Sequence, residues 1–360
     1  MDRLYVDRIG RVCDRMKVQG IGQLMVTDYL SIYYLTGMEV HPGERFWGLL
    51  VGDDGSLRLF ANRLFNIGET DISVTFFDDS DDIAGVVSAH IRKGRLGVDK
   101  TMASRFLLPI MEACRDTSFE LGSDCVDDVR AIKDDEEKEL MRRASRINDA
   151  CMEKLAAFIH EGVTEKECAA YLDGCYAEYG CDGLSFPSIV SFGENAADPH
   201  HHPDDTVLKE GDCIVIDIGC IKDHYCSDMT RTYFWKKADP DQIKVYETVK
   251  EANERAEALV KAGIRLCDID AAARDHISAE GYGEYFTHRL GHFIGMEDHE
   301  KGDVSSVNTK ETKAGMIFSI EPGIYLPGQV GVRIEDLVIV TEEGCEILNH
   351  VSKELCILGN

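Results

Sequence analysis

The sequence lacks any run of about 18 apolar residues, the length that a membrane-spanning helix requires. We therefore expect no transmembrane segment and no membrane partner. The N-terminus, MDRLYVDRIGRVCDRM, also lacks the apolar core of a secretory signal. Its pattern is that of an amphipathic helix belonging to a mature domain. Together these absences predict a cytoplasmic protein.

Paired cysteines are missing as well. The 13 cysteines follow no repeated spacing and include no Cys-x-x-Cys pair. An odd number scattered over 360 residues argues against a disulfide framework and favours a reducing compartment. Most of these cysteines are expected to be small, buried, hydrophobic side chains.

Positive charge is scarce, because 39 Lys and Arg residues stand against 66 Asp and Glu residues, for a net charge of −27. Such a field repels nucleic acid and anionic membranes, so neither is expected as a partner. The excess acid serves either solubility or a site that concentrates cations. Charge alone does not choose between the two.

The length of 360 residues predicts two domains. The first part has a helical pattern at 2–18, apolar strands at 23–27 and 95–98, and a hairpin whose strands 46–51 and 57–60 flank Asp53-Asp54-Gly55. No glycine-rich loop that could cradle a phosphate is visible here. This part is predicted to be an α/β domain without chemistry of its own.

A polar stretch at 126–136 predicts the boundary between the domains. Asp134 or Asp135 can cap a long helix that runs to about residue 160, and Thr164 begins a second helix with a capping box. Beyond residue 183 the pattern predicts strands at 185–191, 213–219, 229–235, 316–321 and 332–340, and helices at 240–262 and 267–280.

Two aspartates stand out in this second part. Asp217 lies inside the nearly continuous apolar strand 213–219, where a charge is costly unless it is paired or bound to a metal. Asp228 follows in the next strand pattern, and a hairpin between the two strands would bring both carboxylates together. One such pair, taken alone, indicates a polar hairpin turn rather than a site.

Three histidines follow at short spacing. His288, His292 and His299 are interleaved with Gly291 and Gly295. A lone histidine is usually an ordinary polar residue, but this grouping indicates a site. Neutral imidazole is a common nitrogen ligand for divalent metals.

Two glutamates complete the set. Glu321 ends an apolar strand just before Pro-Gly, and Glu335 is embedded in the strand pattern 332–340. Four carboxylates and one imidazole favour Mn, Co or Zn and do not resemble a cysteine-based structural zinc site. Two such ions, about 3.5–4 Å apart, lower the pKa of a bridging water and polarise a carbonyl oxygen. That chemistry hydrolyses amides.

In this order, and with the flanks IDIG, SDMTRT, GHFIG, EPG and RIED, the five residues resemble the pita-bread metallopeptidases, the group of creatinase, aminopeptidase P and prolidase. The resemblance extends to Tyr34-Leu-Thr-Gly37 in the first domain. It implies an α/β (α+β) chain with a creatinase/prolidase-like domain at 1–128. A catalytic pita-bread domain at 129–360 follows, with a curved, largely antiparallel sheet covered by helices.

The resemblance implies a role for each ligand. Asp217 would hold one metal ion, Asp228 and Glu335 would bridge both, and His292 and Glu321 would complete the second. Glu321 is in addition the expected general base. Two divalent ions per subunit are expected, with manganese placed before cobalt or zinc.

Other residues match family positions around the substrate. His200, which ends Asn195-Ala-Ala-Asp-Pro-His200, and His299 resemble histidines that steady the substrate carbonyl and the tetrahedral intermediate. His288 resembles a histidine that lines the pocket for the residue after the scissile bond. Arg333 resembles an arginine beside the site.

Two arginines bear on substrate length. The stretch His41-Pro-Gly-Glu-Arg45 resembles an N-domain loop of bacterial Xaa-Pro dipeptidases that reaches over the active site of the other subunit, which implies a homodimer. His288-Arg-Leu-Gly-His292 also resembles those dipeptidases. Arg45 and Arg289 are therefore expected to bind a free C-terminal carboxylate, because arginine matches a carboxylate bidentately.

The chain departs from the family pattern at several places. His41 and Gly43 stand where Asp and His are usual, and Asp298 replaces an apolar residue before the histidine. A Lys-Gly-Asp stretch at 301–303 replaces a Pro-containing turn. These departures concern substrate length and specificity rather than the ligand positions.

The leading prediction is a metal-dependent Xaa-Pro dipeptidase, or prolidase, acting on short proline-containing peptides. The alternatives are an aminopeptidase P acting on longer peptides, a creatinase-like hydrolase without a dinuclear metal, and a catalytically dead binding module. The complete ligand set speaks against the last two. His201 and His202 are expected to be solvent-facing neighbours of His200. The preferred N-terminal residue and the physiological metal stay open.

Overall fold

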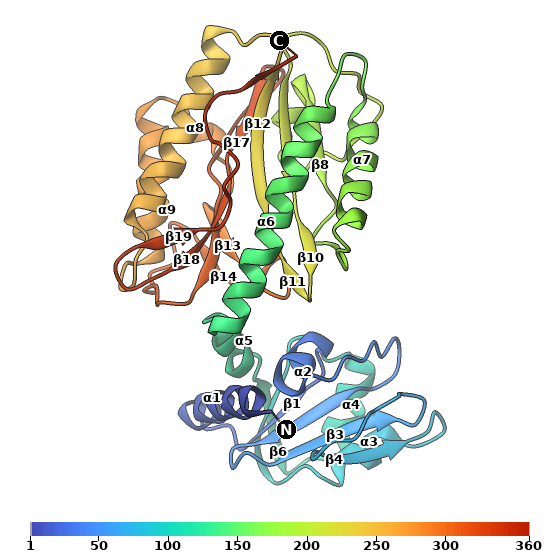
Figure 1. The fold of residues 1–360 in the computed structure, drawn as a ribbon. Helices are drawn as coiled ribbons and strands as arrows, with labels where there is room; N and C mark the ends of the chain where they lie inside the picture. Colours follow the sequence, from blue (N-terminus) through green and yellow to red (C-terminus); the bar gives the residue numbers. More distant parts are fainter. Residues whose placement is uncertain (1, 360) are drawn as a thin grey trace. The chain divides into compact units, whose positions relative to one another are not determined.

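The computed structural model describes residues 2–359, which divide into one compact unit up to Arg130 and a second from Ala131 onward (Figure 1). Among the described residues, no helix is long and apolar enough to cross a membrane. Each unit has its own sheets and its own buried core.

The first unit is built on a six-stranded mixed sheet with the order β4-β3-β2-β1-β5-β6. The expected hairpin is confirmed, because β2 and β3 pair antiparallel on either side of Asp53-Asp54-Gly55. Gly55 has a φ of +82°, which a glycine adopts without steric cost. The strands are β1 (Gln23–Val26), β2 (Gly48–Gly52), β3 (Leu57–Asn62), β4 (Ser73–Phe77), β5 (Gly94–Val98) and β6 (Thr117–Leu121). The helices are α1 (Arg3–Gln19), α2 (Tyr29–Thr36), α3 (Ile83–Ser88), α4 (Ser104–Ala113) and α5 (Asp124–Arg130).

The helices of the second unit begin where local capping signals predict. Asp134 caps α6 (Asp135–Phe158) and Thr164 caps α7 (Glu165–Glu178), each in a capping box. The other helices are α8 (Pro240–Leu259) and α9 (Leu266–Ala279), with short 3₁₀ turns η1 (Gly193–Ala197) and η2 (Gly283–Tyr285).

The strands of this unit form two larger sheets, with the orders β20-β12-β9-β8 and β14-β13-β15-β18-β19. Their strands are β8 (Ile189–Phe192), β9 (Cys213–Ile218), β12 (Met229–Trp235), β13 (Gly291–Phe293), β14 (Glu300–Val304), β15 (Ile317–Ile320), β18 (Asp336–Val340), β19 (Cys345–Ile347) and β20 (Ile357–Leu358). Smaller sheets contain β7 (Gly183–Leu184), β10 (Cys220–Lys222) and β11 (Tyr225–Cys226), and β16 (Gly323–Leu326) with β17 (Val330–Arg333). All but one of the pairings within these sheets are antiparallel, as expected for this domain.

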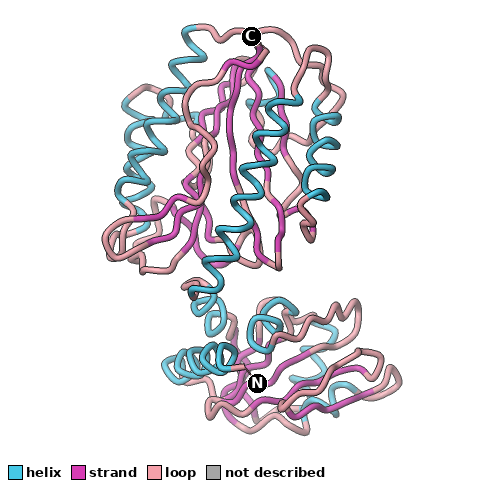
Figure 2. The backbone as a smooth tube through the Cα atoms, in the orientation of Figure 1, coloured by secondary structure: helices cyan, strands magenta, loops and turns pink. Residues whose placement is uncertain are grey.

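Helices cover both faces of the central strands (Figure 2). On β9, Cys213 and Val215 pack in a core with α8 and α9, whereas Ile214 and Ile216 pack in a second core with α6 and α7. Figure 1 accordingly shows α8 and α9 together on one side of the strands, apart from α6 and α7. Because successive side chains of a strand alternate, Asp217 lies on the face of Cys213 and Val215.

One predicted strand is wrong in its extent. The pattern 332–340 divides into β17 and β18, which pair with β16 and β15 in different sheets. Glu335 therefore lies in the break between two strands and is not embedded in one. Its own amide donates to Thr230 O at 3.1 Å, so a long-range contact ends the strand where local hydrophobicity would continue it. The predicted strand 185–191 is likewise shorter at its start, since β8 begins at Ile189.

Candidate metal centre

A cavity of about 510 Å³ in the second unit brings together residues from widely separated parts of the sequence. The five expected metal ligands all line it, and so do most of the residues expected to contact substrate. The lining includes Asp217, Asp228, His292, Glu321 and Glu335, together with His200, His288, Arg289, His299 and Arg333.

Strand register places the two aspartates together. Asp217 on β9 pairs directly with Thr230 on β12, and Asp228 precedes Thr230 by two positions, so all three side chains share one face. This is the juxtaposition expected from the hairpin. Thr230 also links the strands to the fourth carboxylate, because its Oγ1 donates to Glu335 Oε2 at 2.7 Å.

His292 reaches the same point from the neighbouring sheet. Its Nε2 lies 3.3 Å from Asp228 Oδ2 and 3.6 Å from Glu321 Oε1. Ser319 on β15 joins two of these ligands, since its Oγ accepts from the His292 amide at 3.0 Å and donates to Glu321 Oε1 at 3.1 Å. Gly291 permits this approach, because a Cβ there would lie only 1.8 Å from Ser319 O.

Burial gives these groups unusual acidities. Asp228 and Glu335 are 3% and 2% exposed. Burial, with repulsion from neighbouring carboxylates, raises the pKa of both well above the usual range. Burial also raises the pKa of Glu321 to about 8 and lowers the pKa of His292 to about 3. Without a bound cation, these buried carboxylates therefore lie close to one another at a cost in free energy.

This donor set fits divalent metal ions. Asp217 Oδ1 and Asp228 Oδ1 are both buried and have no hydrogen-bond partner among the described residues. One ligand atom from each of Asp228, His292 and Glu335 lies within 4.8 Å of the others. Buried acceptors left free on carboxylates, beside a neutral imidazole, are ligands that Mn, Co and Zn share. The second unit can therefore hold divalent metal at this point.

Arg333 is buried beside the candidate ligands, and its guanidinium donates hydrogen bonds to three other side chains of the protein. Its Nη2 donates to Asp217 Oδ2 at 2.6 Å, its Nε to Thr230 Oγ1 at 3.0 Å and its Nη1 to the Tyr325 hydroxyl at 2.8 Å. The guanidinium therefore fixes one oxygen of Asp217 and leaves the other, Oδ1, free. The predicted place beside the site is observed, and the bonds show that Arg333 orients a carboxylate.

His288 and Tyr325 form another wall of the cavity. His288 Nε2 lies 3.0 Å from the Tyr325 hydroxyl, and Nδ1 lies 2.7 Å from Arg289 O. Burial, together with the charge of Arg333, lowers the pKa of His288 to about 4. The imidazole is therefore neutral at physiological pH. Tyr325 carries no motif of its own in the sequence, and the sequence did not point to it.

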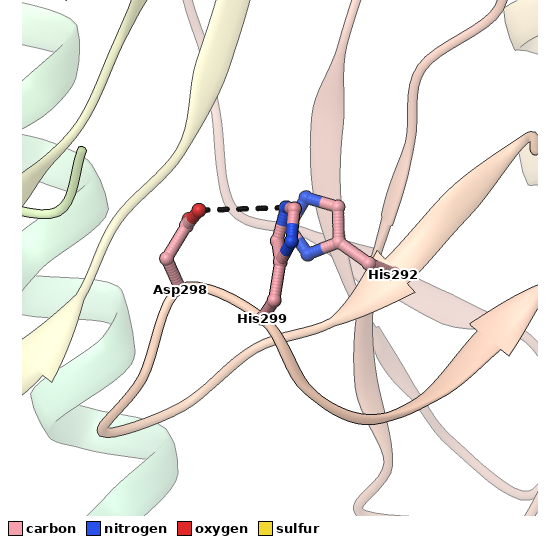
Figure 3. Close-up of side chains that lie close together, drawn as sticks. All are labelled: His292, Asp298 and His299. Atoms are coloured by element: carbon pink, nitrogen blue, oxygen red, sulfur yellow. Dashed lines mark ion pairs between the residues drawn. The ribbon is translucent and has the colours of Figure 1, made fainter. Parts of the chain in front are cut away.

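His299 and its neighbour Asp298 lie next to His292. The rings of His292 and His299 are 4.1 Å apart between centroids, and His299 Nε2 lies 3.5 Å from Asp298 Oδ2. Figure 3 shows Asp298 directed at the two imidazoles. The departure at position 298 therefore adds a carboxylate next to the ligands, where an apolar residue was the usual choice. Burial raises the pKa of Asp298 to about 7.

The neighbours of His200 differ from the expectation. His202 is exposed, as predicted, although it also lines the cavity. The expectation that His201 faces solvent is wrong, because its Nε2 lies 2.8 Å from an oxygen of the fully buried Glu165. A run of three histidines carries no local signal that separates one from the next.

Arg45 belongs to the first unit and forms no part of this cavity. Its Nε and Nη2 donate to the two carboxylate oxygens of Asp79, each at 2.9 Å. The two donors that a carboxylate ligand would need are thus engaged with Asp79.

The sequence matches two family profiles. Residues 139–342 match metallopeptidase family M24, and residues 8–132 match the creatinase/prolidase N-terminal domain. An uncharacterized peptidase of Staphylococcus aureus is 36% identical over 351 residues, which cover 96% of this chain and 99% of that protein.

Solved structures agree over the full length. The structure of a dipeptidase from Pyrococcus horikoshii OT3 matches with a TM-score of 0.93 at 37% identity, covering 98% of this chain and all of that one. A prolidase from Thermococcus sibiricus matches with a TM-score of 0.90 at 35% identity, covering 99% of this chain and 100% of that chain.

Proposed function

The chain belongs to metallopeptidase family M24, and on that basis we propose that it hydrolyses the peptide bond before proline in Xaa-Pro dipeptides. One observation carries the proposal. A single cavity holds the five candidate ligands together with Arg289, a cation suited to a free C-terminal carboxylate. The full-length similarity to a dipeptidase and to a prolidase supports it.

In this proposal the carboxylates and His292 hold two divalent ions, with manganese the first choice for an oxygen-rich set. Asp217, Asp228, His292, Glu321 and Glu335 would hold these ions. When bound, the metal would lower the pKa of a water and polarise the substrate carbonyl.

The side chains of this chain then move protons and hold the substrate. Glu321 takes a proton from the attacking water and returns it to the departing proline nitrogen. His200 and His299 donate to the carbonyl oxygen as negative charge develops on it. His288, neutral and fixed by Tyr325, lines the space for the proline ring.

The substrate length distinguishes this proposal from an aminopeptidase P. A dipeptidase binds the carboxylate that follows proline directly, whereas an aminopeptidase P leaves room for further residues. We expect purified enzyme loaded with Mn to cleave Xaa-Pro dipeptides with a higher kcat/KM than the matching Xaa-Pro-Yaa tripeptides. Faster tripeptide cleavage across the panel would assign the enzyme to the aminopeptidase class instead.

Arg45 is proposed to contribute to this selectivity from a second subunit. Arg45→Ala should raise KM for dipeptides more than for tripeptides, by about tenfold or more, because a charge-assisted hydrogen bond to the carboxylate is lost. Arg63→Ala is the matched control, since Arg63 makes a similar exposed ion pair with Asp78 in the same unit. An equal change for both substrate lengths removes Arg45 from the recognition of the carboxylate.

The proposal includes a homodimer and a cytoplasmic address. The dimer follows from the cross-subunit role given to the loop that contains Arg45. All 13 cysteines are free thiols, which supports a reducing compartment.

A further inference from the structure

A buried carboxylate outside the metal centre holds one loop of the cavity. Glu165, the first residue of α7, is 0% exposed. Its Oε1 accepts from the Phe192 amide at 2.7 Å and from Asn195 Nδ2 at 3.0 Å. Its Oε2 accepts from the Asp204 amide at 3.0 Å and lies 2.8 Å from His201 Nε2. All four partners come from the segment 192–204.

These contacts argue for a latch rather than for a further metal site. Glu165, His201 and Asp204 have oxygen and nitrogen atoms close enough together to hold an ion. Both oxygens of Glu165, however, already accept two hydrogen bonds each, and N–H donors occupy the directions that a cation would need. A buried carboxylate that is saturated in this way fixes the backbone that supplies its donors.

The segment held by Glu165 carries His200. That histidine lines the cavity, and its own amide donates to Asp198 Oδ1 at 3.0 Å. The start of the segment is also packed tightly, because a Cβ on Gly331 would lie 1.7 Å from Ala196 O. Gly331 belongs to β17, the strand that ends at Arg333. The loop is therefore fixed at both ends around a side chain that lines the cavity.

We propose that Glu165 is a positioning residue that sets the place of His200 by clamping segment 192–204, with His201 as one arm of the clamp. The inference rests on the proposed function in one respect, namely that His200 acts on the substrate carbonyl. Glu165 touches neither the five candidate ligands nor the cavity, so its effect passes through the loop.

The decisive variant is Glu165→Gln, which keeps the shape of the side chain. On one side the new NH₂ group faces the N–H donors of Phe192 and Asn195, and on the other it faces the Asp204 amide beside His201, whose ring can accept as the other tautomer. In either orientation at least one hydrogen bond of the clamp is lost. We expect kcat for the best Xaa-Pro peptide to fall about 10- to 100-fold while KM changes little, because the reacting groups are misplaced rather than the substrate released. The Kd for Mn should stay at the wild-type value.

The matched control is Glu167→Gln. Glu167 lies in the same helical turn and caps it by accepting from the Thr164 amide at 2.9 Å, but it is exposed and its side chain is hydrogen-bonded to Thr164. Its replacement should leave kcat unchanged. A second variant, His201→Ala, removes one arm of the clamp and should lower kcat in the same direction by a smaller factor.

Coupling to His200 separates positioning from general stability. His200→Ala alone should lower kcat about 100-fold, as loss of a donor to the oxyanion does. In the His200→Ala background, Glu165→Gln should then have no further effect on kcat. Unchanged kcat in Glu165→Gln, or losses that multiply in the double variant, would overturn the proposal.

Hydrogen exchange tests the clamp without activity. We expect amides of segment 192–204 to exchange faster in Glu165→Gln than in wild type and Glu167→Gln. If the wild type cleaves no Xaa-Pro peptide, the proposed function fails, and the exchange rates alone decide whether Glu165 holds the loop. Unaltered exchange in Glu165→Gln refutes the clamp in either case.

Discussion

Glu321→Gln should lower kcat by at least about 1,000-fold on the best Xaa-Pro peptide while the protein keeps its fold. The variant removes a proton acceptor, which by itself contributes about 10²- to 10⁴-fold, and it also removes one ligand charge. The change keeps the volume of the side chain, and the hydrogen bond from Ser319 Oγ to Oε1 can persist. Steady-state kinetics at saturating Mn, with circular dichroism of both proteins, measure the effect.

The control is Glu342→Gln, an exposed glutamate of the same unit. It should retain the kcat of the wild type. A Glu321→Gln enzyme with wild-type turnover would refute the assigned base. A variant that no longer binds Mn would be inactive for that reason alone. The Mn content of the purified variant is therefore measured alongside, and the base is assigned from protein that keeps its Mn.

Removal of metal should abolish activity and lower Tm, and both should recover when Mn is added. The carboxylates of Asp228 and Glu335 are buried next to other acids, so without metal they must either hold protons or repel their neighbours, and bound cations remove both costs. Binding at about 100 times Kd adds roughly 2.7 kcal/mol to the free energy of unfolding. For the second unit, which spans residues 131–360, that corresponds to a Tm increase of about 5–10 °C.

The Tm increase should also depend on pH. The pKa values of Asp228 and Glu335 are higher in the folded metal-free protein than in the unfolded chain. The folded protein therefore still holds protons at pH values at which the unfolded chain has released them. Its stability therefore falls as pH rises above about 4. Metal competes with those protons, so the increase on adding Mn should be larger at pH 8 than at pH 5.

Asp228→Asn is the control for this experiment, because it removes one ligand charge. Its response to Mn should be much smaller than that of the wild type. Full activity in chelator, or an equal Tm in chelator and in Mn at pH 8, would contradict a catalytic metal centre.

The elements whose boundaries were predicted best are those with local signals. β12 spans the predicted residues 229–235, α6 begins after Asp134, one of the two candidate caps, and α7 begins after the predicted cap Thr164. Capping and alternation involve neighbours within a few residues, so they can be read without knowledge of the fold. The break at Glu335 could not be read, because a distant partner, Thr230 O, causes it.

The candidate metal centre likewise contains residues that the local sequence identifies and residues that only the fold identifies. Asp217, Asp228, His292, Glu321 and Glu335 could be singled out because each is an ionisable residue in an apolar or glycine-rich setting. The residues that hold them, Thr230, Ser319 and Tyr325, are of common types without a distinctive pattern. Only contacts across strands identify them.

By itself, the sequence determined the family, since five candidate metal ligands with their flanks point to a metallopeptidase before any coordinates are known. It also determined the two-part α/β architecture through periodicity and caps. Only the tertiary structure showed which carboxylate oxygens of the candidate ligands have no hydrogen-bond donor and are available to a metal ion. Strand register places Asp217 opposite Thr230, and Arg333 occupies one oxygen of that aspartate. The structure also revealed Glu165 beneath the His200 loop, because burial and hydrogen-bond saturation depend on residues far apart in the chain.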